Sequence, residues 1–481
     1  MKLILHKVQE RALDVSVVYI AEKQADFSEY SFTTTELEYI KKQIEADKKA
    51  IDINSYFKWS YVRIIENEDA EYMTLEKMRK RASELYGTLK KNEHEEVLIV
   101  DVSGENKKVK AFLEGLILSH YQFLKYKTGD GDKKNILKHI RVLSEGLSEE
   151  ELKRLEILSK GVYYARDLVN EPLSSLNAVQ LGEEFRRLAR EAGFSADVFN
   201  KKKIESLRLY GLLAVNRGSL DPPTFTVMEW KPENPRNKKP IVLIGKGIVY
   251  DTGGISLKPT SGMLDMKSDM AGGATVAGIM YVAAKSELPV HLIGLVPATD
   301  NRPDGNAYTP GDVITMHNEK TVEVINTDAE GRMVLADALS FAKQYDPELV
   351  FDFATLTGSA SVAIGPQGVI AMGNTERSVF DRIIESGKNM YERIVELPLW
   401  DEYNEMIKSE IADIKNAGGR EAGAITAGKF LEHFTDYSWI HFDIAPTAYL
   451  DKKDAYRPKG GTGIGVRLMY DFLKNYKLLK D

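Results

Sequence analysis

The chain has 481 residues and a formal net charge of −7, with 43% hydrophobic and 28% charged residues. A chain of this length is too long to fold around one small hydrophobic core, so we expect at least two domains. The negative net charge argues against a dedicated nucleic-acid-binding protein. Cysteine is absent, which excludes disulfides, cysteine-ligated zinc and thiol catalysis.

The first residues of the chain do not resemble a secretory signal, because charged residues interrupt each of the short apolar runs in 1–20. No part of the sequence approaches the ~18 consecutive apolar residues of a membrane span. We therefore expect a cytoplasmic protein without a membrane partner.

Residues 1–145 are rich in lysine and glutamate and poor in glycine. The apolar run at 96–102 predicts a strand, and the amphipathic pattern at 108–126 predicts a helix after it. The composition of 127–134 is that of a loop. This part of the chain carries no binding motif that we recognise.

A long helical pattern follows, which begins after Ser148 and ends before Pro172. It divides the chain into three expected parts. These are an N-terminal α/β domain at 1–147, a linker helix at 148–170 and a second α/β domain at 171–481.

From residue 171 onward, apolar runs alternate with helical patterns. Strands are predicted at 240–247, 290–298, 348–356 and 439–444, and helices near 178–192, 270–286, 333–346 and 423–436. This alternation predicts a mixed, mostly parallel central sheet covered by helices on both faces. In such sheets the functional groups gather beyond the carboxyl ends of the strands.

Charged residues follow these strands or open the helices after them. They are Lys246, Asp251, Lys258, Asp269 and, in the turn NTDAEGR after the apolar run VEVI, Asp328, Glu330 and Arg332. Each has an ordinary structural explanation by itself: a helix cap, a turn residue, a surface lysine or an ion-pair partner.

Taken together, these residues indicate a metal site. A lysine directly after a buried strand needs an ionic partner, and converging carboxylates repel one another unless a multivalent cation neutralises them. Acid-rich sites without cysteine suit Mg²⁺, Mn²⁺ or Zn²⁺, and two such ions ~3.5–4 Å apart can share carboxylates. No His-Glu-x-x-His spacing is present.

The sequence resembles the leucyl aminopeptidase family, the di-metal cytosol aminopeptidases or M17 peptidases. The resemblance covers nearly all of 160–475, and its most specific segments are GKGIVYDTGGISLKP, MKSDMAGGA and NTDAEGR. The N-terminal third is less alike. The resemblance implies a macro-like N-terminal domain with an oligomerisation or regulatory role, a catalytic domain at 171–481, and a homohexamer.

The resemblance also implies a ligand set for two divalent ions, which would be zinc, manganese or one of each, with magnesium as an alternative. One ion would be held by Lys246, Asp251, Asp269 and Glu330. The other would be held by Asp251, Asp328 and Glu330, with the backbone carbonyl of Asp328.

The remaining roles follow from the same resemblance. Lys258 would stabilise the oxyanion of the tetrahedral intermediate, and Arg332 would hold a bicarbonate ion that acts as general base. The substrate side chain would lie near Met266, Thr355, Gly358 and Ala448, and the Leu356 carbonyl would accept from the substrate amine. We expect broad specificity with a preference for N-terminal leucine and other apolar residues.

One segment departs from the family pattern. Ala271-Gly272-Gly273 stands where the order Gly-Gly-Ala is expected, although no ligand is lost. Two rival functions remain open. A di-metal phosphatase would use the same metal chemistry, but the sequence lacks a Gly-x-x-x-x-Gly-Lys-Ser/Thr loop. A DNA-binding role would depend on the basic segment 78–91, which we expect to be a solvated helix face.

Overall fold

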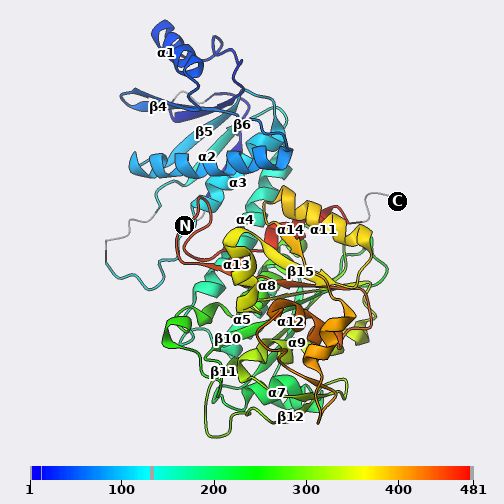
Figure 1. Cartoon of the computed structure of the whole chain (residues 1–481). Coiled ribbons are helices and arrows are strands. Elements are labelled where there is room, and N and C mark those ends of the chain that lie inside the picture. Colours follow the sequence, from blue (N-terminus) through cyan, green and yellow to red (C-terminus); the bar gives the residue numbers. More distant parts are fainter. Residues whose placement is uncertain (1–2, 12–13, 130–134, 477–481) are drawn as a thin grey trace. The chain divides into compact units, whose positions relative to one another are not determined.

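The structure is a computed structural model that describes residues 3–11, 14–129 and 135–476. The chain forms two compact units (Figure 1). Unit 1 comprises Met1–Ser159 and Lys453–Pro458, and unit 2 comprises Lys160–Lys452 and Lys459–Asp481. The first boundary between the units falls inside helix α4 (Glu149–Asn170). The end of the expected loop at 127–134 lies outside the described residues.

Within the described residues, unit 1 is built on a six-stranded sheet with the order β1-β6-β5-β2-β4-β3, in which β3 is the antiparallel edge strand. Its elements are β1 (Ile4–Lys7), β2 (Ser16–Ala21), α1 (Thr34–Glu45), β3 (Ala50–Ser55), β4 (Lys58–Ile64), α2 (Glu71–Lys91), β5 (Glu96–Asp101), α3 (Asn106–Ser119) and β6 (His139–Leu143). Helix α1 covers one face, and α2 and α3 lie on the other (Figure 1). The strand predicted at 96–102 is β5.

Local signals explain where two helices of this part begin. Thr33 and Glu36 form a reciprocal capping box at the start of α1. Ser148 and Glu151 do the same at the start of α4, where the Glu151 N–H donates to Ser148 Oγ at 3.2 Å. The helix start expected at Ser148 is therefore confirmed.

The helix predicted at 108–126 is wrong in its last turns, because α3 ends at Ser119. The following residue, His120, is committed to a tertiary contact instead. Its carbonyl accepts a hydrogen bond from the side chain of Asn135, and its ring contacts the Leu137 carbonyl at 2.9 Å. The periodic pattern that predicted the helix carries no information about a contact partner this distant in sequence.

The basic segment 78–91 lies in α2, where its two arginines form ion pairs within unit 1 and Lys80, Lys90 and Lys91 are exposed. Arg79 is buried, and its Nε donates to Glu114 Oε2 at 2.6 Å. Arg81 pairs with Glu66 at 2.7 Å and with Glu84 at 3.0 Å. These arginines are engaged in ion pairs rather than presented as a phosphate-binding face.

Unit 2 is built on a larger mixed sheet with the order β16-β15-β18-β14-β9-β11-β8-β7, and β10 pairs with the end of β11. Its strands are β7 (Ser195–Phe199), β8 (Thr224–Trp230), β9 (Ile241–Gly245), β10 (Gly247–Asp251), β11 (Leu292–Asn301), β14 (Leu349–Ala354), β15 (Val369–Gly373), β16 (Ile394–Glu396) and β18 (Trp439–Asp443). The central strands β18, β14, β9 and β11 are parallel. This is the mixed, mostly parallel α/β architecture expected from the sequence.

Helices cover both faces of this sheet. The main helices are α5 (Ala178–Ala192), α7 (Tyr210–Asn216), α8 (Ala271–Lys285), α9 (Glu330–Ala342), α11 (Arg377–Asn389), α12 (Gly423–Glu432) and α14 (Val466–Lys474); shorter ones are α6 (Lys201–Ser206), α10 (Gly358–Ile364) and α13 (Ala445–Ala448). Short 3-10 helices are η1 (Thr260–Gly262), η2 (Met266–Ser268), η3 (Thr327–Ala329), η4 (Lys343–Tyr345), η5 (Gly365–Gln367) and η6 (Asp401–Ile407). Helices α5, α8 and α14 pack together, and α7, α9 and α12 form a separate layer.

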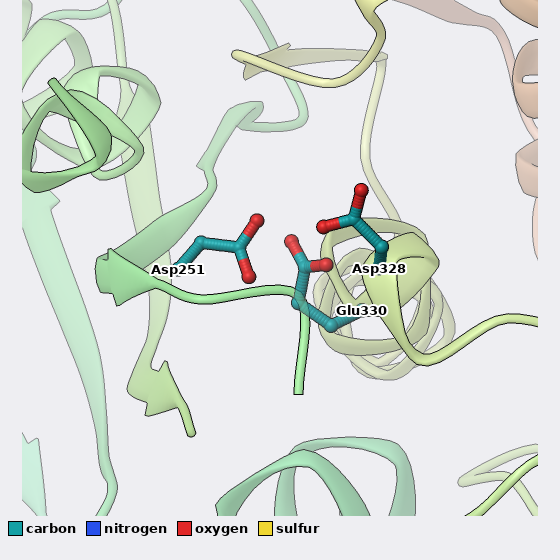
Figure 2. A group of neighbouring side chains, drawn as sticks. All are labelled: Asp251, Asp328 and Glu330. Atoms are coloured by element: carbon teal, nitrogen blue, oxygen red, sulfur yellow. The ribbon is translucent and has the colours of Figure 1, made fainter. Parts of the chain in front are cut away.

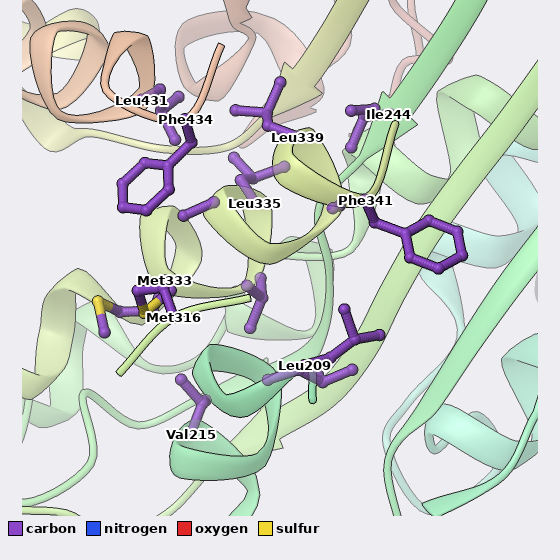
Figure 3. Packing of buried hydrophobic residues seen from close by; sticks show 14 of the residues in the cluster. Leu209, Val215, Ile244, Met316, Met333, Leu335, Leu339, Phe341, Leu431 and Phe434 are labelled. Atoms are coloured by element: carbon purple, nitrogen blue, oxygen red, sulfur yellow. The ribbon is translucent and has the colours of Figure 1, made fainter. Parts of the chain in front are cut away.

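The core on the α9 side fixes the position of that helix. Leu335 and Leu339 of α9 are fully buried against Ile244 of β9 and Leu431 of α12 (Figure 3). Burying a leucine contributes about 1.5–3 kcal/mol each. Because α9 begins at Glu330, this packing sets where the NTDAEGR turn lies.

The strand-like run VEVI is not part of the central sheet. It contributes β13 (Thr321–Glu323), which pairs with β12 (Val313–Thr315) and β17 (Ile414–Lys415) in a small separate sheet. A two-residue ladder, β19 (Tyr449–Leu450) with β20 (Gly460–Gly461), lies near the C-terminus. Val322 and Val324 are fully buried in the α9 core, which is why the run has the pattern of a core strand.

No helix in the described ranges has both the length and the apolar character that a bilayer span requires.

Candidate functional site

Lys246 lies between β9 and β10, and its side chain is only 3% exposed. Its backbone N–H continues the pairing with β14 by donating to the Phe353 carbonyl at 3.0 Å. Its Nζ lies 2.8 Å from Asp269, 2.9 Å from Glu330 and 3.0 Å from the Thr355 carbonyl. The lysine that follows an apolar strand therefore has the ionic partners that its burial demands.

The carboxylates of Asp251, Asp328 and Glu330 converge (Figure 2). One oxygen from each lies within 4.8 Å of the others. Asp251 ends β10, whereas Asp328 and Glu330 come from the turn that opens α9. The two segments are far apart in sequence, and the edge of the sheet brings them together.

This crowding changes the proton affinity of the group. Burial and the neighbouring charge of Glu330 raise the pKa of Asp251 to about 6, although Lys258 and Lys246 oppose the shift. Burial also raises the pKa of Asp328. Burial acts on Glu330 in the same direction, but the charges of Lys246 and Lys258 outweigh it, so that its pKa is lowered.

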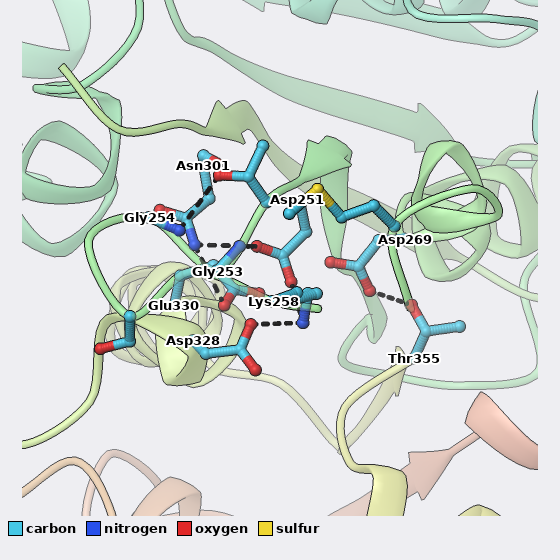
Figure 4. Close-up of polar contacts among 12 residues, drawn as sticks. Asp251, Gly253, Gly254, Lys258, Asp269, Asn301, Asp328, Glu330 and Thr355 are labelled. Atoms are coloured by element: carbon cyan, nitrogen blue, oxygen red, sulfur yellow. Dashed lines mark hydrogen bonds and ion pairs between the residues drawn. The ribbon is translucent and has the colours of Figure 1, made fainter. Parts of the chain in front are cut away.

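Asp269 completes the set of expected carboxylates. It follows the short helix η2, and its Oδ1 accepts hydrogen bonds from Lys246 Nζ at 2.8 Å and from Thr355 Oγ1 at 2.7 Å (Figure 4). Burial raises the pKa of Asp269 well above its usual value. Lys246 thus lies between Asp269 and Glu330 and joins the two sides of the cluster.

Lys258 reaches the same carboxylates from the loop after β10. Its Nζ lies 2.8 Å from Asp251 Oδ2 and also contacts Asp328 Oδ1 (Figure 4). Its side chain is 18% exposed, more than that of Lys246. A cation at this open side of the cluster can meet a ligand that enters from solvent.

Asn301 is a residue that the sequence interpretation missed. It ends β11, is buried, and uses its Nδ2 to donate to Asp251 Oδ1 at 2.8 Å, to the Thr327 carbonyl at 3.0 Å and to Glu330 Oε2 at 3.4 Å. Tyr308 Oη donates to the same Thr327 carbonyl at 2.9 Å. These contacts fix the turn that presents the acids. Asn301 follows the strand predicted at 290–298, so its place at a strand end was the available signal.

Two glycines make room for Lys246. A Cβ on Gly331, within NTDAEGR, would lie 2.6 Å from Lys246 Nζ. A Cβ on Gly272, in the first turn of α8, would lie 1.9 Å from the Phe353 carbonyl oxygen and 2.8 Å from the backbone nitrogen of Lys246. The close approach of α8 to β9 and β14 therefore requires glycine at 272.

Arg332 lies in the first turn of α9 and is 8% exposed. Its Nη1 donates to the Asn416 carbonyl at 2.7 Å, whereas its Nε is buried without a hydrogen-bond partner among the described residues. Burial lowers the pKa of Arg332 to about 10, against the charges of Glu330 and Asp443. The guanidinium remains charged at neutral pH, and its Nε–H is available to donate to an anion.

The residues expected to bind the substrate lie on three segments. Thr355, Leu356 and Gly358 follow β14, and a Cβ on Gly358 would meet no atom within 4 Å. Met266 opens η2, and Ala448 is buried at the end of α13. The Thr355 hydroxyl is engaged with Asp269, which makes this side chain a support for the acid cluster.

The donor set fits divalent cations. Four carboxylates, those of Asp251, Asp269, Asp328 and Glu330, face two lysine ammonium groups, which leaves an excess of two negative charges. Carboxylate oxygens with one amine nitrogen suit hard or borderline ions such as Mn²⁺, Mg²⁺ and Zn²⁺.

The chain is similar to known proteins of one family. The sequence model of the cytosol aminopeptidase family, catalytic domain, matches residues 163–470. A probable cytosol aminopeptidase of Chlorobium phaeobacteroides is 45% identical over 383 residues, covering 77% of this chain and 76% of that protein. One from Chlorobaculum parvum is 48% identical over 369 residues, covering 74% of this chain and 73% of that protein.

A solved structure is also similar over nearly the whole chain. It is titled the bottromycin maturation enzyme BotP in complex with Mn, and it matches with a TM-score of 0.84 and 28% sequence identity. The match covers 96% of this chain and 99% of that chain.

The fold and the acid-rich site define a metal-dependent hydrolase. Because the family model matches residues 163–470, the chain belongs to the cytosol aminopeptidase family, as its sequence resemblance predicted. It is an aminopeptidase of the M17 type, which hydrolyses peptides from their N-terminus with the help of metal ions.

Proposed function

We propose that the protein is a leucyl-type aminopeptidase that uses two divalent ions, zinc or manganese. The convergence of Asp251, Asp328 and Glu330 within 4.8 Å carries this proposal. These three would hold one ion together with the Asp328 carbonyl. Asp251 and Glu330 would share a second ion with Asp269 and the amine of Lys246.

When bound, the ions would supply a water of lowered pKa and polarise the scissile carbonyl. The other roles in the reaction would belong to side chains of the protein. Lys246 must give up its proton to act as a ligand, and it is held in position by the Thr355 carbonyl. Lys258, at the more open side of the cluster, would turn its ammonium group to the oxyanion that develops on the substrate.

Arg332 would bind a planar anion, which the family resemblance identifies as bicarbonate. The supporting observation is the buried Nε–H that has no partner among the described residues. A guanidinium offers paired donors to an oxyanion of this shape, and bicarbonate would supply a general base.

Specificity and organisation belong to the same proposal. Apolar residues near Met266 and Ala448 would favour leucine and other apolar N-terminal residues, with the Leu356 carbonyl accepting from the substrate amine. A domain division at 1–147, 148–170 and 171–481, and a homohexamer, are what the family resemblance implies for this chain.

The test is hydrolysis of leucine p-nitroanilide by the metal-reconstituted protein and by Asp328→Ala. We expect the variant to lose at least about a hundredfold in kcat/KM, because it removes a direct ligand of one ion. Asp304→Ala, on an exposed loop, is the matched control and should retain full activity.

p-Nitrophenyl phosphate is assayed in parallel, because a di-metal phosphatase would use similar ligands. Turnover of the phosphate ester but not of the anilide would overturn the aminopeptidase proposal. Equal anilide activity in the wild type and in Asp328→Ala would overturn the ligand assignment.

A further inference from the structure

Unit 1 contains a cavity of about 520 Å³ on the α1 face of its sheet. Val17 and Tyr19 of β2 and Leu98 of β5 form an apolar wall, and Glu36 at the start of α1 and Arg11 line it as well. Ligand pockets are typically about 300–1,000 Å³ and combine an apolar lining with a few polar groups. This cavity has both features, and neither the family match nor the metal chemistry accounts for it.

Tyr19 is the polar group that most needs explanation. It is 4% exposed and packed among Phe27, Tyr30 and Phe32, with ring centroids 5.1 to 6.4 Å away. No described residue forms a hydrogen bond with its hydroxyl. Tyr19 lines the cavity, where its hydroxyl can pair with water or with a polar group of a ligand. Burial raises the pKa of Tyr19 to about 12, so the hydroxyl stays a donor at neutral pH.

Residues of opposite charge line the same cavity as Tyr19: Arg11 and Lys58 are basic and Glu36 is acidic. The Arg11 guanidinium lies 4.2 Å above the Tyr30 ring and donates to the Glu29 carbonyl at 2.7 Å. The Glu36 carboxylate accepts from the Thr33 N–H at 2.8 Å and from Ser55 Oγ at 3.0 Å. The charges of Arg11 and Glu36 act on the pKa of Tyr19 in opposite directions, Arg11 lowering it and Glu36 raising it.

We propose that this cavity binds a free amino acid with a large apolar side chain. The side chain would lie against Val17 and Leu98, the carboxylate would meet Arg11 and the Tyr19 hydroxyl, and the ammonium group would meet Glu36. Such amino acids are what an aminopeptidase releases, so the site would sense product; that last step rests on the proposed function.

The test is calorimetric titration of the full-length chain with L-phenylalanine. Tyr19→Phe should weaken binding at this site about tenfold, because it removes one hydrogen bond to a charged group. Tyr39→Phe removes a hydroxyl from the exposed side of α1 and is the matched control, expected to bind like the wild type. Val17→Trp fills the cavity and should abolish binding there.

Titrations in an Asp328→Ala background identify any binding at the metal site. Tyr19→Phe should fold normally because no residue in the described ranges bonds to the lost hydroxyl, so it remains informative even if Val17→Trp unfolds. L-Phenylalaninamide lacks the carboxylate and 3-phenylpropionate lacks the ammonium group. Both are titrated into metal-free Asp328→Ala, because an active aminopeptidase would hydrolyse the amide, and both should bind at least about tenfold more weakly.

The proposal is overturned if the wild type takes up no L-phenylalanine at millimolar concentration, or if wild type and Tyr19→Phe bind equally. It is also overturned if either analogue binds as tightly as phenylalanine. The binding assay does not depend on peptide hydrolysis, so failure of the aminopeptidase assay would leave this result standing.

Discussion

The side chain of Lys246 places a positive charge deep within unit 2, where two carboxylates and a carbonyl receive it. Burial favours the neutral amine, but the charges of Asp269, Glu330 and Asp251 outweigh it and raise the pKa of Lys246. Lys246 and Lys258 therefore balance part of the negative charge that metal ions would otherwise neutralise.

Asn301 supports two of the acids at once, which leads to a prediction about metal affinity. Asn301→Ala should weaken metal binding about 10–100-fold, because supporting hydrogen bonds orient metal ligands. The measurement is calorimetric titration of the metal-free protein with Mn²⁺. Asn318→Ala, on an exposed turn, should leave the affinity unchanged. An unchanged affinity in Asn301→Ala would show that the acids hold their positions without it.

Asp337 gives a prediction about pH. It is fully buried in α9, and burial raises its pKa to about 7, although the backbone N–H groups of Leu212, His317 and Gly211 oppose this. Because the folded state then holds the proton more tightly than the unfolded chain, stability is complete below the unfolded pKa. It falls as the pH rises from about 4 to about 7.

The expected loss over this range is on the order of 4 kcal/mol. Asp337→Asn cannot ionise, so it should remove this component of the pH dependence while adding a constant penalty. The measurement is the denaturant midpoint of both proteins across the pH range. Asp304→Asn, on an exposed loop, is the control. Parallel curves for wild type and Asp337→Asn would contradict the prediction.

At the scale of elements, the edge of the central sheet explains the site. The strands β9, β14 and β18 run parallel, and Lys246, Thr355 and Asp443 lie at or just beyond their carboxyl ends. Helix α9 is fixed by its buried leucines, so its first residue, Glu330, and Asp328 of the preceding η3 lie at the same edge. The acids meet because separate elements end at one place.

The start of α8 leads to a prediction about packing. Gly272→Ala should destabilise unit 2 by about 3 kcal/mol, because the new Cβ would lie 1.9 Å from the Phe353 carbonyl oxygen. Chemical denaturation measures the change. Gly87→Ala in α2 is the matched control: no atom lies within 4 Å of its Cβ, so it should stabilise by about 0.5–1 kcal/mol. A Gly272→Ala protein as stable as the wild type would show that α8 can move away from the strands.

At the scale of the molecule, the chain has two compact units, and the candidate metal ligands all belong to unit 2. Removing bound metal should therefore lower the unfolding temperature of unit 2 and leave that of unit 1 unchanged. A ligand at 100 times its Kd stabilises by about 2.7 kcal/mol. Calorimetric scans with and without a chelator measure the effect. Equal shifts in both transitions would contradict it.

The sequence by itself determined most of the element pattern and the chemistry of the ligands. The helix expected near 178–192 is α5, Ala178–Ala192, because Asn177 caps its start and Gly193 ends it in the left-handed conformation. Such signals act between neighbouring residues. The carboxylates and lysines were recognisable because they follow apolar strands and match family segments.

Only the tertiary structure decided the features that depend on distant partners. The end of α3 depends on Asn135, the VEVI run joins a small separate sheet, and Asn301 contacts acids 29 and 50 residues away. The contact of Gly272 with the Phe353 carbonyl of β14 explains why the order Ala271-Gly272-Gly273 has a glycine at 272. Periodicity reports which residues are buried, but it does not report which backbone or side chain they are buried against.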